Sequence, residues 1–547
     1  MEGFSTTHIE EACSWQAIPS NTLFRAYLRA EQSLRALWLG PHYADWRAGG
    51  FAVPQDGRRA HLRALSEVLL AQVRRLGGDA QAQSAARVLA HPEALAVVTG
   101  QQVGLLGGPL YTFYKILTAL QLRQAVQERH PDRPVVAVFW LEGEDHDLRE
   151  VNQLAWPADG TLMRAHLELK EERPIAMCAR LLPEEISDWL GALWSRLPDT
   201  PYAGPVRSQL EAAYQPGRSW SEAFARLLYG LFADTGLVLL DPADPALKRL
   251  WEEFFVRVLR EWPQVFRSLR EQSERLSAQG YELPLRPRPI GLFWMEPDGE
   301  RRALEPEPDA RVRWRGTDRS WTQAELLDRV RIEPERISPG VALRPLAQDW
   351  LLPTVAYVAG PAEVAYWAQV LALYPHFGLR PPVVWPRLSA TLLDPAALRL
   401  LERLGLRFVE LFERAELLQE RLLARYAPLS VPFSAARAAI EAGLEQLLAP
   451  VRELDPTLEG AWGRTRARIL QELEALEVRT RRAQRRRHAE LLAQLLRLLS
   501  HVAPEGELQE RVWSTAYALL RWGPESLRER LTEHALNPDR HHLVRMP

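Results

Sequence analysis

Three short segments of the chain place glycines beside amide and charged side chains, the residue types that bind or transform small polar molecules. The first runs from Thr99 to Lys115 and reads TGQQVGLLGGPLYTFYK. Glycines at the start of a helix let backbone N–H groups approach a phosphate or carboxylate. Their spacing matches neither the dinucleotide nor the Walker A fingerprint, so a tight strand-to-helix turn also explains them. The polar residues among them favour a site, in which Lys115 is predicted to be catalytic and these residues to bind substrate: Thr99, Gly100, Gln101, Gln102, Gly104 and Tyr111.

The second segment, Glu142 to Asp147, reads EGEDHD and gathers four carboxylates around one imidazole. Such a group could coordinate Mg²⁺, act as acid and base, or hold a substrate ammonium, and crowded like charges raise at least one carboxyl pKa. We favour ammonium binding or base catalysis, although the acids could instead cap the following helix. No second His or Cys lies at ligand spacing, so no zinc site is predicted. The predicted catalytic residues are Asp145, His146 and Asp147, and Asn152 is predicted to bind substrate.

The third segment begins with RPLAQD and continues as LLPTVAYVAGPAEVAYWAQ. It repeats the order of strand, glycine, proline and helix that the first segment shows, so the two could face one pocket. A guanidinium pairs with a carboxylate through two parallel hydrogen bonds, which makes Arg344 a candidate for holding an acidic substrate group. The residues of this segment predicted to bind substrate are Arg344, Gln348, Asp349, Tyr357, Gly360 and Glu363.

Short apolar runs place these segments at the ends of strands. LAVVT at 95–99 and PVVAVFWL at 134–141 read as buried strands, and a helix from Pro109 to about Glu128 separates them. This βαβ unit predicts parallel strands in an open, doubly wound α/β sheet of the Rossmann type. Further strands are expected at 237–240, 354–360 and 381–385.

The spacing of these strands predicts a Rossmann-like core over 1–410 that two connective insertions interrupt, at about 152–229 and 281–343. The second insertion alternates polar and apolar residues and reads as a small antiparallel meander. Residues 411–535 are rich in Leu, Arg, Glu and Ala, which predicts an α-helical coiled coil or helical hairpin with a bend at Pro450 to Pro456. Residues 536–547 are expected to form a tail, with His541 and His542 on the surface.

The composition argues against a protein that binds nucleic acid or a membrane. The chain has 547 residues, 47% of them apolar, and a net charge of -2, which exerts no general attraction for nucleic acid or an anionic membrane. The basic run from Arg479 to His488 could contact RNA, but neighbouring glutamates favour a solvated helix face or a contact with nucleotide phosphates. Two distant cysteines, no secretory signal at the N-terminus and no long apolar run predict a cytoplasmic protein.

The three segments, together with LQERVWS at Leu508 to Ser514, resemble the signatures of the bacillithiol biosynthesis cysteine-adding enzymes, the BshC family. The resemblance spans nearly the whole chain. It implies a coiled coil used for homodimerisation and a ligase that adds cysteine to glucosaminyl malate, forming an amide bond as the last step of the pathway. An adenine nucleotide (ATP or ADP), with or without Mg²⁺, is the implied cofactor, and Gln509 and Arg511 are its candidate contacts.

From this resemblance we expect Gly100, Gln101, Gly104 and Lys115 to hold the activated cysteine. We expect Asp145, His146 and Asp147 to receive the sugar ammonium, and Arg344 with Gln348 to bind the malyl carboxylates. The chain lacks the His-x-Gly-His and Lys-Met-Ser-Lys-Ser elements of related synthetase-like ligases, which leaves the mode of carboxyl activation open, as an adenylate or an acyl phosphate. The alternative is a non-catalytic binding or scaffold protein of the same pathway, which would bind the amino-sugar malate without turnover.

Overall fold

The computed structural model describes residues 11–53, 61–169, 173–426 and 430–547. Residues 1–10, on which part of the expectation about a secretory signal rests, lie outside this range. The described residues form two compact units. The core unit comprises 11–156, 163–392 and 508–547, and the helical unit comprises 157–162 and 393–507. This division differs from the predicted one at both ends of the helical region, because the chain returns to the core at 508.

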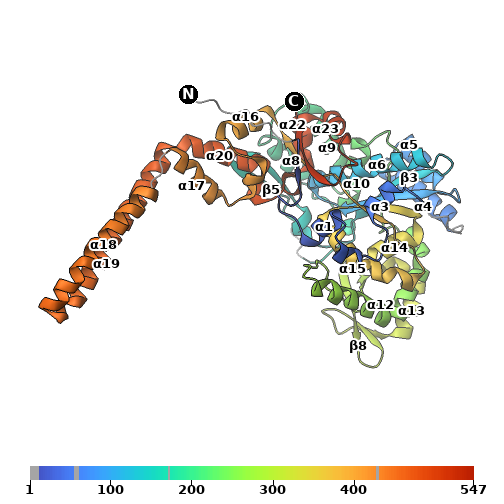
Figure 1. The fold of residues 1–547 in the computed structure, drawn as a ribbon. Helices are drawn as coiled ribbons and strands as arrows, with labels where there is room; N and C mark the ends of the chain where they lie inside the picture. Colours follow the sequence, from blue (N-terminus) through green and yellow to red (C-terminus); the bar gives the residue numbers. More distant parts are fainter. Residues whose placement is uncertain (1–10, 54–60, 170–172, 427–429) are drawn as a thin grey trace. The chain divides into compact units, whose positions relative to one another are not determined.

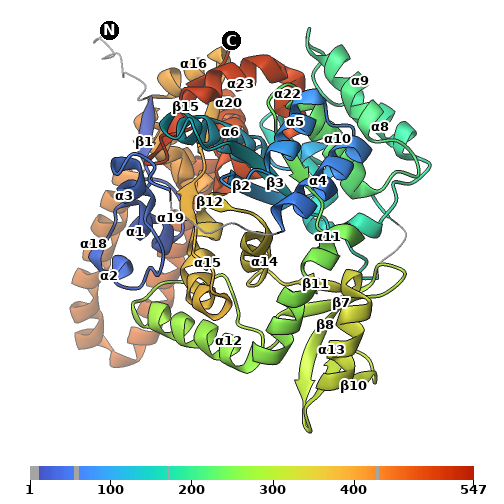
Figure 2. The same cartoon turned by 90° about the vertical axis from the view of Figure 1, so that its right-hand side faces the viewer.

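A five-stranded parallel sheet lies at the centre of the core unit, in the order β13-β12-β2-β3-β6 (Figure 2). Its strands are β2 (Leu95–Gln102), β3 (Val135–Glu142), β6 (Val238–Leu240), β12 (Thr354–Ala359) and β13 (Val383–Pro386). The predicted Rossmann-type sheet is therefore confirmed. Buried residues run without interruption from Leu95 to Gly100 in β2 and from Val135 to Leu141 in β3, because both faces of the sheet are covered.

The helix α6 (Tyr111–Arg129) crosses from β2 to β3, as the sequence predicts, and packs against both strands. From β2 the chain builds the sheet towards β3 and β6, and it later returns to the other side of β2 with β12 and β13. The strand order therefore reverses between β2 and β12. In open sheets of this kind, ligands bind at the carboxyl ends of the strands where the order reverses.

Each of the two insertions has helices and strands of its own, and the second is antiparallel, as its alternating residues predict. The first contains α7 (Leu148–Val151), β4 (Gln153–Ala158) and β5 (Thr161–His166), followed by α8 (Ile186–Trp194), α9 (Ala203–Ala213) and α10 (Trp220–Leu231). The second follows α12 (Glu252–Ala278) and forms an antiparallel sheet in the order β10-β9-β8-β7-β11. These strands are β7 (Leu292–Met295), β8 (Arg301–Glu307), β9 (Arg311–Trp314), β10 (Ser320–Thr322) and β11 (Ile337–Pro339).

The second insertion also holds a helix, α13 (Gln323–Ile332), that the alternating pattern does not predict. Thr322 starts it with a capping box, in which its hydroxyl accepts from the Glu325 backbone N–H and the Glu325 carboxylate accepts from the Thr322 backbone. Three tryptophans pack together in this insertion: Trp294, Trp314 and Trp321. They give the small sheet an apolar core of its own.

The helical unit contains α16 (Pro395–Leu404), α17 (Ala415–Tyr426), α18 (Ser430–Leu454), α19 (Glu459–Arg487) and α20 (Ala489–Val502). Helices α18 and α19 run side by side as a hairpin (Figure 1). The chain reverses at Asp455, whose side chain caps the short turn Pro456–Leu458. Trp462 Nε1 donates to Leu444 O at 3.0 Å across the hairpin. The predicted bend near Pro450 to Pro456 is thus a complete reversal.

The expected C-terminal tail is wrong. Residues Arg540–Arg545 form β15, which pairs with β1 (Ala12–Ser14) and β14 (Ala390–Leu393) in a three-stranded sheet. His541 and His542 are buried there, not on the surface. His541 lies between the hydroxyls of Ser389 and Thr391, at 2.8 and 2.9 Å. The strands that pair with β15 are far away in sequence, so no local sequence pattern predicts this strand.

No helix in the described part of the chain is long and apolar enough to span a membrane. Cys13 and Cys178 form no disulfide.

Candidate active site

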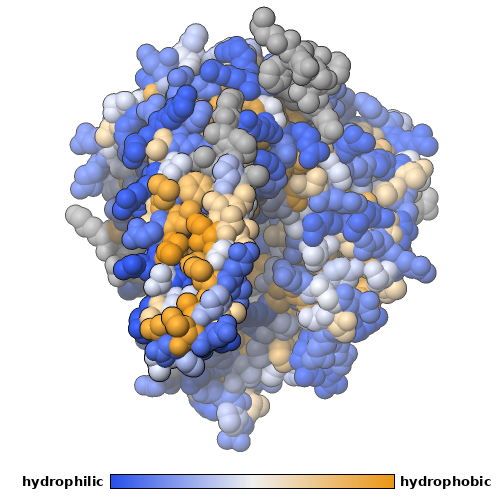
Figure 3. All heavy atoms as spheres, turned by 60° about the vertical axis from the view of Figure 1, so that its left-hand side comes forward, coloured by the Kyte–Doolittle hydropathy of each residue, from blue (hydrophilic) through white to orange (hydrophobic). Residues whose placement is uncertain are grey.

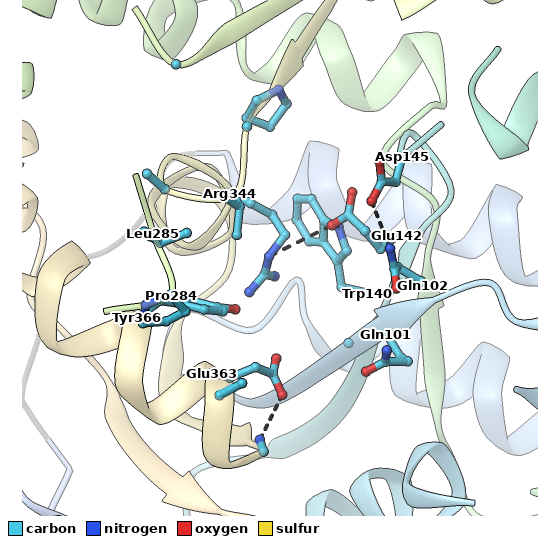
Figure 4. A pocket seen from close by; sticks show the side chains of 18 of the residues that line it. Gln101, Gln102, Trp140, Glu142, Asp145, Pro284, Leu285, Arg344, Glu363 and Tyr366 are labelled. Carbon is cyan, nitrogen blue, oxygen red and sulfur yellow. Dashed lines mark hydrogen bonds and ion pairs between the residues drawn. The ribbon is translucent and has the colours of Figure 1, made fainter. Parts of the chain in front are cut away.

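A cavity of about 940 Å³ opens at the carboxyl ends of β2, β3 and β12, where the strand order reverses. Each of the three predicted segments contributes to its wall, as Gln101, Asp145 and Arg344 show. Arg344 enters from α14 (Arg344–Leu351), a helix that is not among the elements predicted from the sequence. Figure 4 shows its guanidinium pointing towards Glu142, with Tyr366 on the opposite side. The first and third segments therefore face one pocket, as their shared pattern suggests, and the second segment contributes to the same wall.

Lys115 forms a buried brace across this site. Its ammonium donates to Gly100 O at 2.8 Å and to Gln101 Oε1 at 2.9 Å, and it makes an ion pair with Glu363. An ammonium has three donors, so all of them are in use. Burial lowers the pKa of Lys115, and the neighbouring Glu363 carboxylate opposes that shift. Lys115 thus joins the end of β2 to α15 (Pro361–Val370).

Glu363 is equally well satisfied. Its carboxylate accepts from the Gly360 N–H at 2.7 Å and from the Tyr357 hydroxyl at 2.7 Å, in addition to the Lys115 ammonium. Burial alone would raise the pKa of Glu363, but Lys115 and the two hydrogen bonds hold it below its usual value. The carboxylate is therefore ionised at neutral pH, and its role at the start of α15 is that of a cap.

Arg344 differs from this brace because part of its guanidinium has no partner. Nη1 donates to Gln348 Oε1 at 3.1 Å, while Nε lies 3.9 Å from Glu142 Oε2. The guanidinium carbon lies 5.5 Å from the Trp140 ring centroid and 5.1 Å from that of Tyr357. Nη2 is buried and has no hydrogen-bond partner in the described structure. A buried donor of this kind favours an anionic ligand.

Glu142, the last residue of β3, lies across from Arg344 (Figure 4). Its Oε2 accepts from Trp140 Nε1 at 3.1 Å. Burial raises the pKa of Glu142 to about 7 against the opposing charges of Arg344 and Arg301, and the nearby carboxylate of Asp145 adds to the rise. The sequence analysis predicts a raised carboxyl pKa in this segment but does not single out Glu142. A carboxylate with this pKa takes up and releases protons near neutral pH.

Asp145 lies beside Glu142 in a different environment. Its Oδ2 accepts from Gln102 Nε2 at 2.8 Å, its Oδ1 accepts from the His146 N–H at 2.8 Å, and Arg301 Nη1 lies 3.7 Å from Oδ1. Burial would raise the pKa of Asp145, but the Gln102 hydrogen bond and the Arg301 charge hold it below its usual value. Burial and then the charge of Arg301 lower the pKa of His146. At neutral pH this corner therefore holds an ionised Asp145 and a neutral imidazole.

Several predicted site residues lie away from the cavity wall. The Thr99 hydroxyl donates to Val358 O at 2.9 Å, which ties β2 to β12. Asn152 donates from Nδ2 to Leu167 O at 3.3 Å. Asp147 is exposed, and its side chain caps α7 by accepting from the Arg149 N–H at 3.1 Å. For Asp147 the helix-cap interpretation of the acidic segment is the one that the geometry supports.

Gln348 and Asp349 lie behind Arg344 instead of on the cavity surface. Both are buried, and Gln348 Nε2 donates to Asp349 Oδ1 at 2.8 Å. The Tyr374 hydroxyl donates to Asp349 Oδ2 at 2.5 Å. This chain of hydrogen bonds fixes the Gln348 oxygen that accepts from Arg344. The pair therefore positions the guanidinium.

The glycines of the first segment allow close backbone packing and a tight turn. A Cβ on Gly100 would lie 2.9 Å from Trp140 O, and one on Gly104 would lie 2.5 Å from the Gly108 Cα. Leu106, with φ 49°, Gly107 and Gly108 all adopt the left-handed conformation of a tight turn. The Leu106 N–H donates to the Tyr214 hydroxyl at 2.8 Å. This geometry favours the tight-turn interpretation over a phosphate cradle, although Gly100 itself lines the cavity.

The other residues predicted to bind substrate lie on the cavity wall. Gln102, Tyr111, Tyr357 and Gly360 line the cavity with Gln101. The sequence-based prediction missed many residues of the wall, among them Glu142, Arg301, Tyr366 and Arg387. Glu142 could have been found as the polar residue that ends an apolar strand. Arg301 and Arg387 carry no local signal, because they resemble many other arginines of this chain.

The two predicted cofactor contacts behave differently. Arg511 lines the cavity. Gln509 is fully buried, and its amide bonds both backbone groups of Leu392, at 2.8 and 3.0 Å. Gln509 is therefore a structural residue. No group of three or more His, Cys, Asp or Glu residues that could hold a metal ion occurs among the described residues.

The fold and the cavity define a Rossmann-type α/β protein with a small-molecule site at its strand ends and a separate helical unit. The chain belongs to the BshC family of bacillithiol biosynthesis: residues 9–388 match the family's N-terminal Rossmann-like domain, and residues 390–546 match its C-terminal coiled-coil domain. A relative from Salinibacter ruber, named "Putative cysteine ligase BshC", is 37% identical over 88% of each chain. A protein with the same name from Symbiobacterium thermophilum is 34% identical over 89% of this chain and 88% of its own.

Proposed function

We propose that this chain is a ligase that joins the carboxyl group of cysteine to the amine of glucosaminyl malate, as the last step of bacillithiol biosynthesis. The observation that carries the proposal is the opposition of Arg344 to Glu142 and Asp145 across one cavity. In glucosaminyl malate the amine and the malyl group sit on adjacent carbons of the sugar. A substrate with a cation and an anion so close together matches a site that places a guanidinium beside two carboxylates. The name of the relatives, "Putative cysteine ligase BshC", supports the ligation of cysteine.

In this proposal Arg344 binds a malyl carboxylate through the donor that has no protein partner, and Gln348 fixes its orientation. Asp145 is ionised and holds the sugar ammonium. Glu142 removes the proton that the amine must lose before it attacks, because a base with a pKa of about 7 is half ionised near neutral pH. Holding the reactants in place contributes roughly 7 to 11 kcal/mol towards the barrier.

The bond changes follow from amide formation. The sugar ammonium first loses one proton to Glu142. Its nitrogen then attacks the cysteine carbonyl carbon, the bond from that carbon to the oxygen of the activating group breaks, and the second proton of the nitrogen is released to water. The predicted adenine nucleotide, with or without Mg²⁺, would supply this activation when bound. Arg511 is the predicted contact that has access to the cavity. Of the predicted catalytic residues, His146 lines the cavity as a neutral imidazole, while Lys115 and Asp147 act through structure.

The test is to incubate the purified chain with cysteine, glucosaminyl malate, ATP and Mg²⁺ and to follow the thiol conjugate by mass spectrometry. We expect the conjugate from the wild type and a large loss in Glu142→Gln. ATP consumption that tracks the conjugate would identify the nucleotide as a co-substrate. Binding of glucosaminyl malate without product under any activating condition would contradict the ligase and favour a scaffold protein.

We also propose that the chain forms a homodimer through the α18–α19 hairpin and works in the cytoplasm. Helix α19 has no buried residue in the described structure, although it carries apolar side chains such as that of Leu476. Leu447 is 55% exposed and Leu476 is 54% exposed, and Figure 3 shows apolar side chains gathered along the hairpin. Exposed apolar stripes of this kind mark helix–helix interfaces.

Light scattering after size-exclusion chromatography tests the dimer. We expect a dimer for the wild type and a monomer for Leu447→Glu combined with Leu476→Glu. Leu417→Glu is the control, because this leucine is 53% exposed on α17, outside the hairpin. A wild-type monomer, or a dimer that survives the double change, would contradict the proposal.

A further inference from the structure

The wall that the second insertion contributes to the cavity is rich in arginine. Arg286 and Arg288 lie on the extended segment before β7, and Arg301, Arg302 and Arg315 come from β8 and the turn after β9. Pro287 separates the first two, and alternate residues of an extended chain point to the same side. Both exposed arginines line the cavity accordingly.

The cavity carries a surplus of positive charge. Eight arginines and Lys115 line it, against three carboxylates, in a chain whose net charge is -2. Part of this charge is balanced by carboxylates outside the wall: Arg302 pairs with Glu300 at 2.8 Å, Arg315 with Glu305 at 3.4 Å and Arg387 with Glu510 at 2.7 Å. Arg286 and Arg288 form no ion pair within the described residues. A concave site with such a surplus attracts an anion carrying more than one charge.

Arg301 gives a second, independent indication of a site for an anionic ligand. It is only 9% exposed, its guanidinium lies 3.9 Å from the Phe293 ring centroid, and Nη2 donates to Pro339 O at 3.0 Å. Its Nε is buried and has no hydrogen-bond partner in the described structure. A buried cation with an unused donor is costly unless a ligand supplies an acceptor. Arg301 also lies 3.7 Å from Asp145, so the arginine wall begins beside the proposed ammonium site.

The glycine-bearing loop after β2 offers no rival phosphate site. A Cβ on Gly107 would lie 3.1 Å from Thr515, and the Leu106 N–H is taken by the Tyr214 hydroxyl. Its tight packing leaves no cradle of open N–H groups of the kind that binds phosphate at a helix start. Among the walls of the cavity, the arginines of the insertion are the donors suited to several phosphate oxygens.

We propose that this arginine wall is a subsite for the phosphate groups of the activating nucleotide, with Arg286, Arg288 and Arg302 binding phosphate oxygens and Arg301 fixing the group nearest the amine. The inference rests on the proposed function, since amide formation needs an activated carboxyl group. It adds a place for the phosphates that differs from the carboxylate site at Arg344. A guanidinium binds phosphate oxygens in a bidentate manner, which suits an extended polyanion better than a single carboxylate.

Calorimetric titration with inorganic pyrophosphate at fixed ionic strength tests the subsite. We expect saturable binding to the wild type and a loss of about tenfold or more in Arg286→Ala combined with Arg288→Ala. Both arginines are exposed, so the folded state should be unchanged. The matched control is Arg331→Ala, on α13 of the same insertion, where the arginine pairs with Asp328 at 3.0 Å away from the cavity. The control should bind pyrophosphate as the wild type does.

Titration with L-malate separates the two anion sites and the two proposals. Malate binding should weaken in Arg344→Ala and persist in the double arginine variant. If pyrophosphate binds through the wall but malate does not bind at all, the proposed substrate is wrong while the phosphate subsite stands. Absence of pyrophosphate binding to the wild type, equal weakening in the control, or full binding in the double variant would overturn the subsite.

Discussion

Two ion pairs in the wall of the same cavity differ in how many of their hydrogen-bonding groups have partners. Lys115 and Glu363 are in direct contact, and every donor of the ammonium has an acceptor. Arg344 and Glu142 stand 3.9 Å apart, and the guanidinium keeps an unpartnered nitrogen. The first pair therefore leaves nothing for a ligand, whereas the second has capacity for one. A charged residue that lines a cavity need not bind a ligand, whereas a cavity residue with an unpartnered buried donor favours a ligand that supplies an acceptor.

The same contrast appears between the two acids after β3. Asp145 is held ionised by Gln102 and Arg301, while burial raises the pKa of Glu142 to about 7. Pairs of titratable groups whose environments push their pKa values apart mark an assignment of acid and base roles. We therefore assign proton removal to Glu142 and ammonium binding to Asp145.

The largest expected effect is on the rate of amide formation. Glu142→Gln removes the base, and general-base catalysis contributes typically about 10² to 10⁴ in rate. In the wild type kcat/KM should fall as the pH drops below about 7, because protonated Glu142 cannot accept the proton. Conjugate formation measured by mass spectrometry across neutral pH checks both statements.

Asp147→Asn is the matched control for this experiment, because it changes an exposed carboxyl of the same segment. It should keep both the rate and the pH profile. A Glu142→Gln enzyme with the wild-type rate, or an unchanged inflection near neutral pH, would remove Glu142 from the mechanism.

The next effect is on stability. Lys115→Met leaves the partly buried Glu363 without its cation and should lower the free energy of unfolding by about 3 kcal/mol, the lower end of the range for buried pairs. Adding Glu363→Gln should recover part of this loss. Arg344→Met should cost less, because Glu142 has a pKa of about 7 and can take up a proton. Urea denaturation of the variants measures the difference, and equal losses in Lys115→Met and Arg344→Met would erase the contrast between the two pairs.

The smallest effect is expected at Asp147. Asp147→Ala removes the cap of α7 and should lower the free energy of unfolding by about 1 kcal/mol. Conjugate formation should stay near the wild-type level, because the side chain is exposed and does not line the cavity. A strong loss of product in a variant that still folds would show that Asp147 is a catalytic residue, as first predicted.

The framework of the core could be predicted because its signals are local. The apolar runs of β2 and β3 and the helix between them fix a parallel unit, and parallel strands bring the loops after them to one edge of the sheet. Gln101, Asp145 and Gly360, which lie at or after the ends of β2, β3 and β12, could be assigned to a common site on that ground alone. Arg344 precedes β12, so its place in the cavity does not follow from this argument. The antiparallel character of the second insertion followed in the same way from its alternating residues.

What could not be predicted depends on contacts between distant segments. The strand Arg540–Arg545 and its buried His541 acquire their environment from Ser389 and Thr391. Lys115 was predicted to be catalytic and Glu363 to bind substrate, whereas in the structure the two form an ion pair with each other. The sequence could not show this, because it does not reveal how many partners a charged group finds. The arginine wall was missed since an exposed arginine and a cavity arginine look alike in one sequence.

Calorimetric titration with glucosaminyl malate tests the central claim most directly, namely that Arg344 and the acids opposite form the substrate site. The account predicts saturable binding to the wild type, a weakening of about ten- to a hundredfold in Arg344→Lys, and no change in Asp147→Ala. Equal affinity of the wild type and Arg344→Lys, or no binding to the wild type, would contradict it.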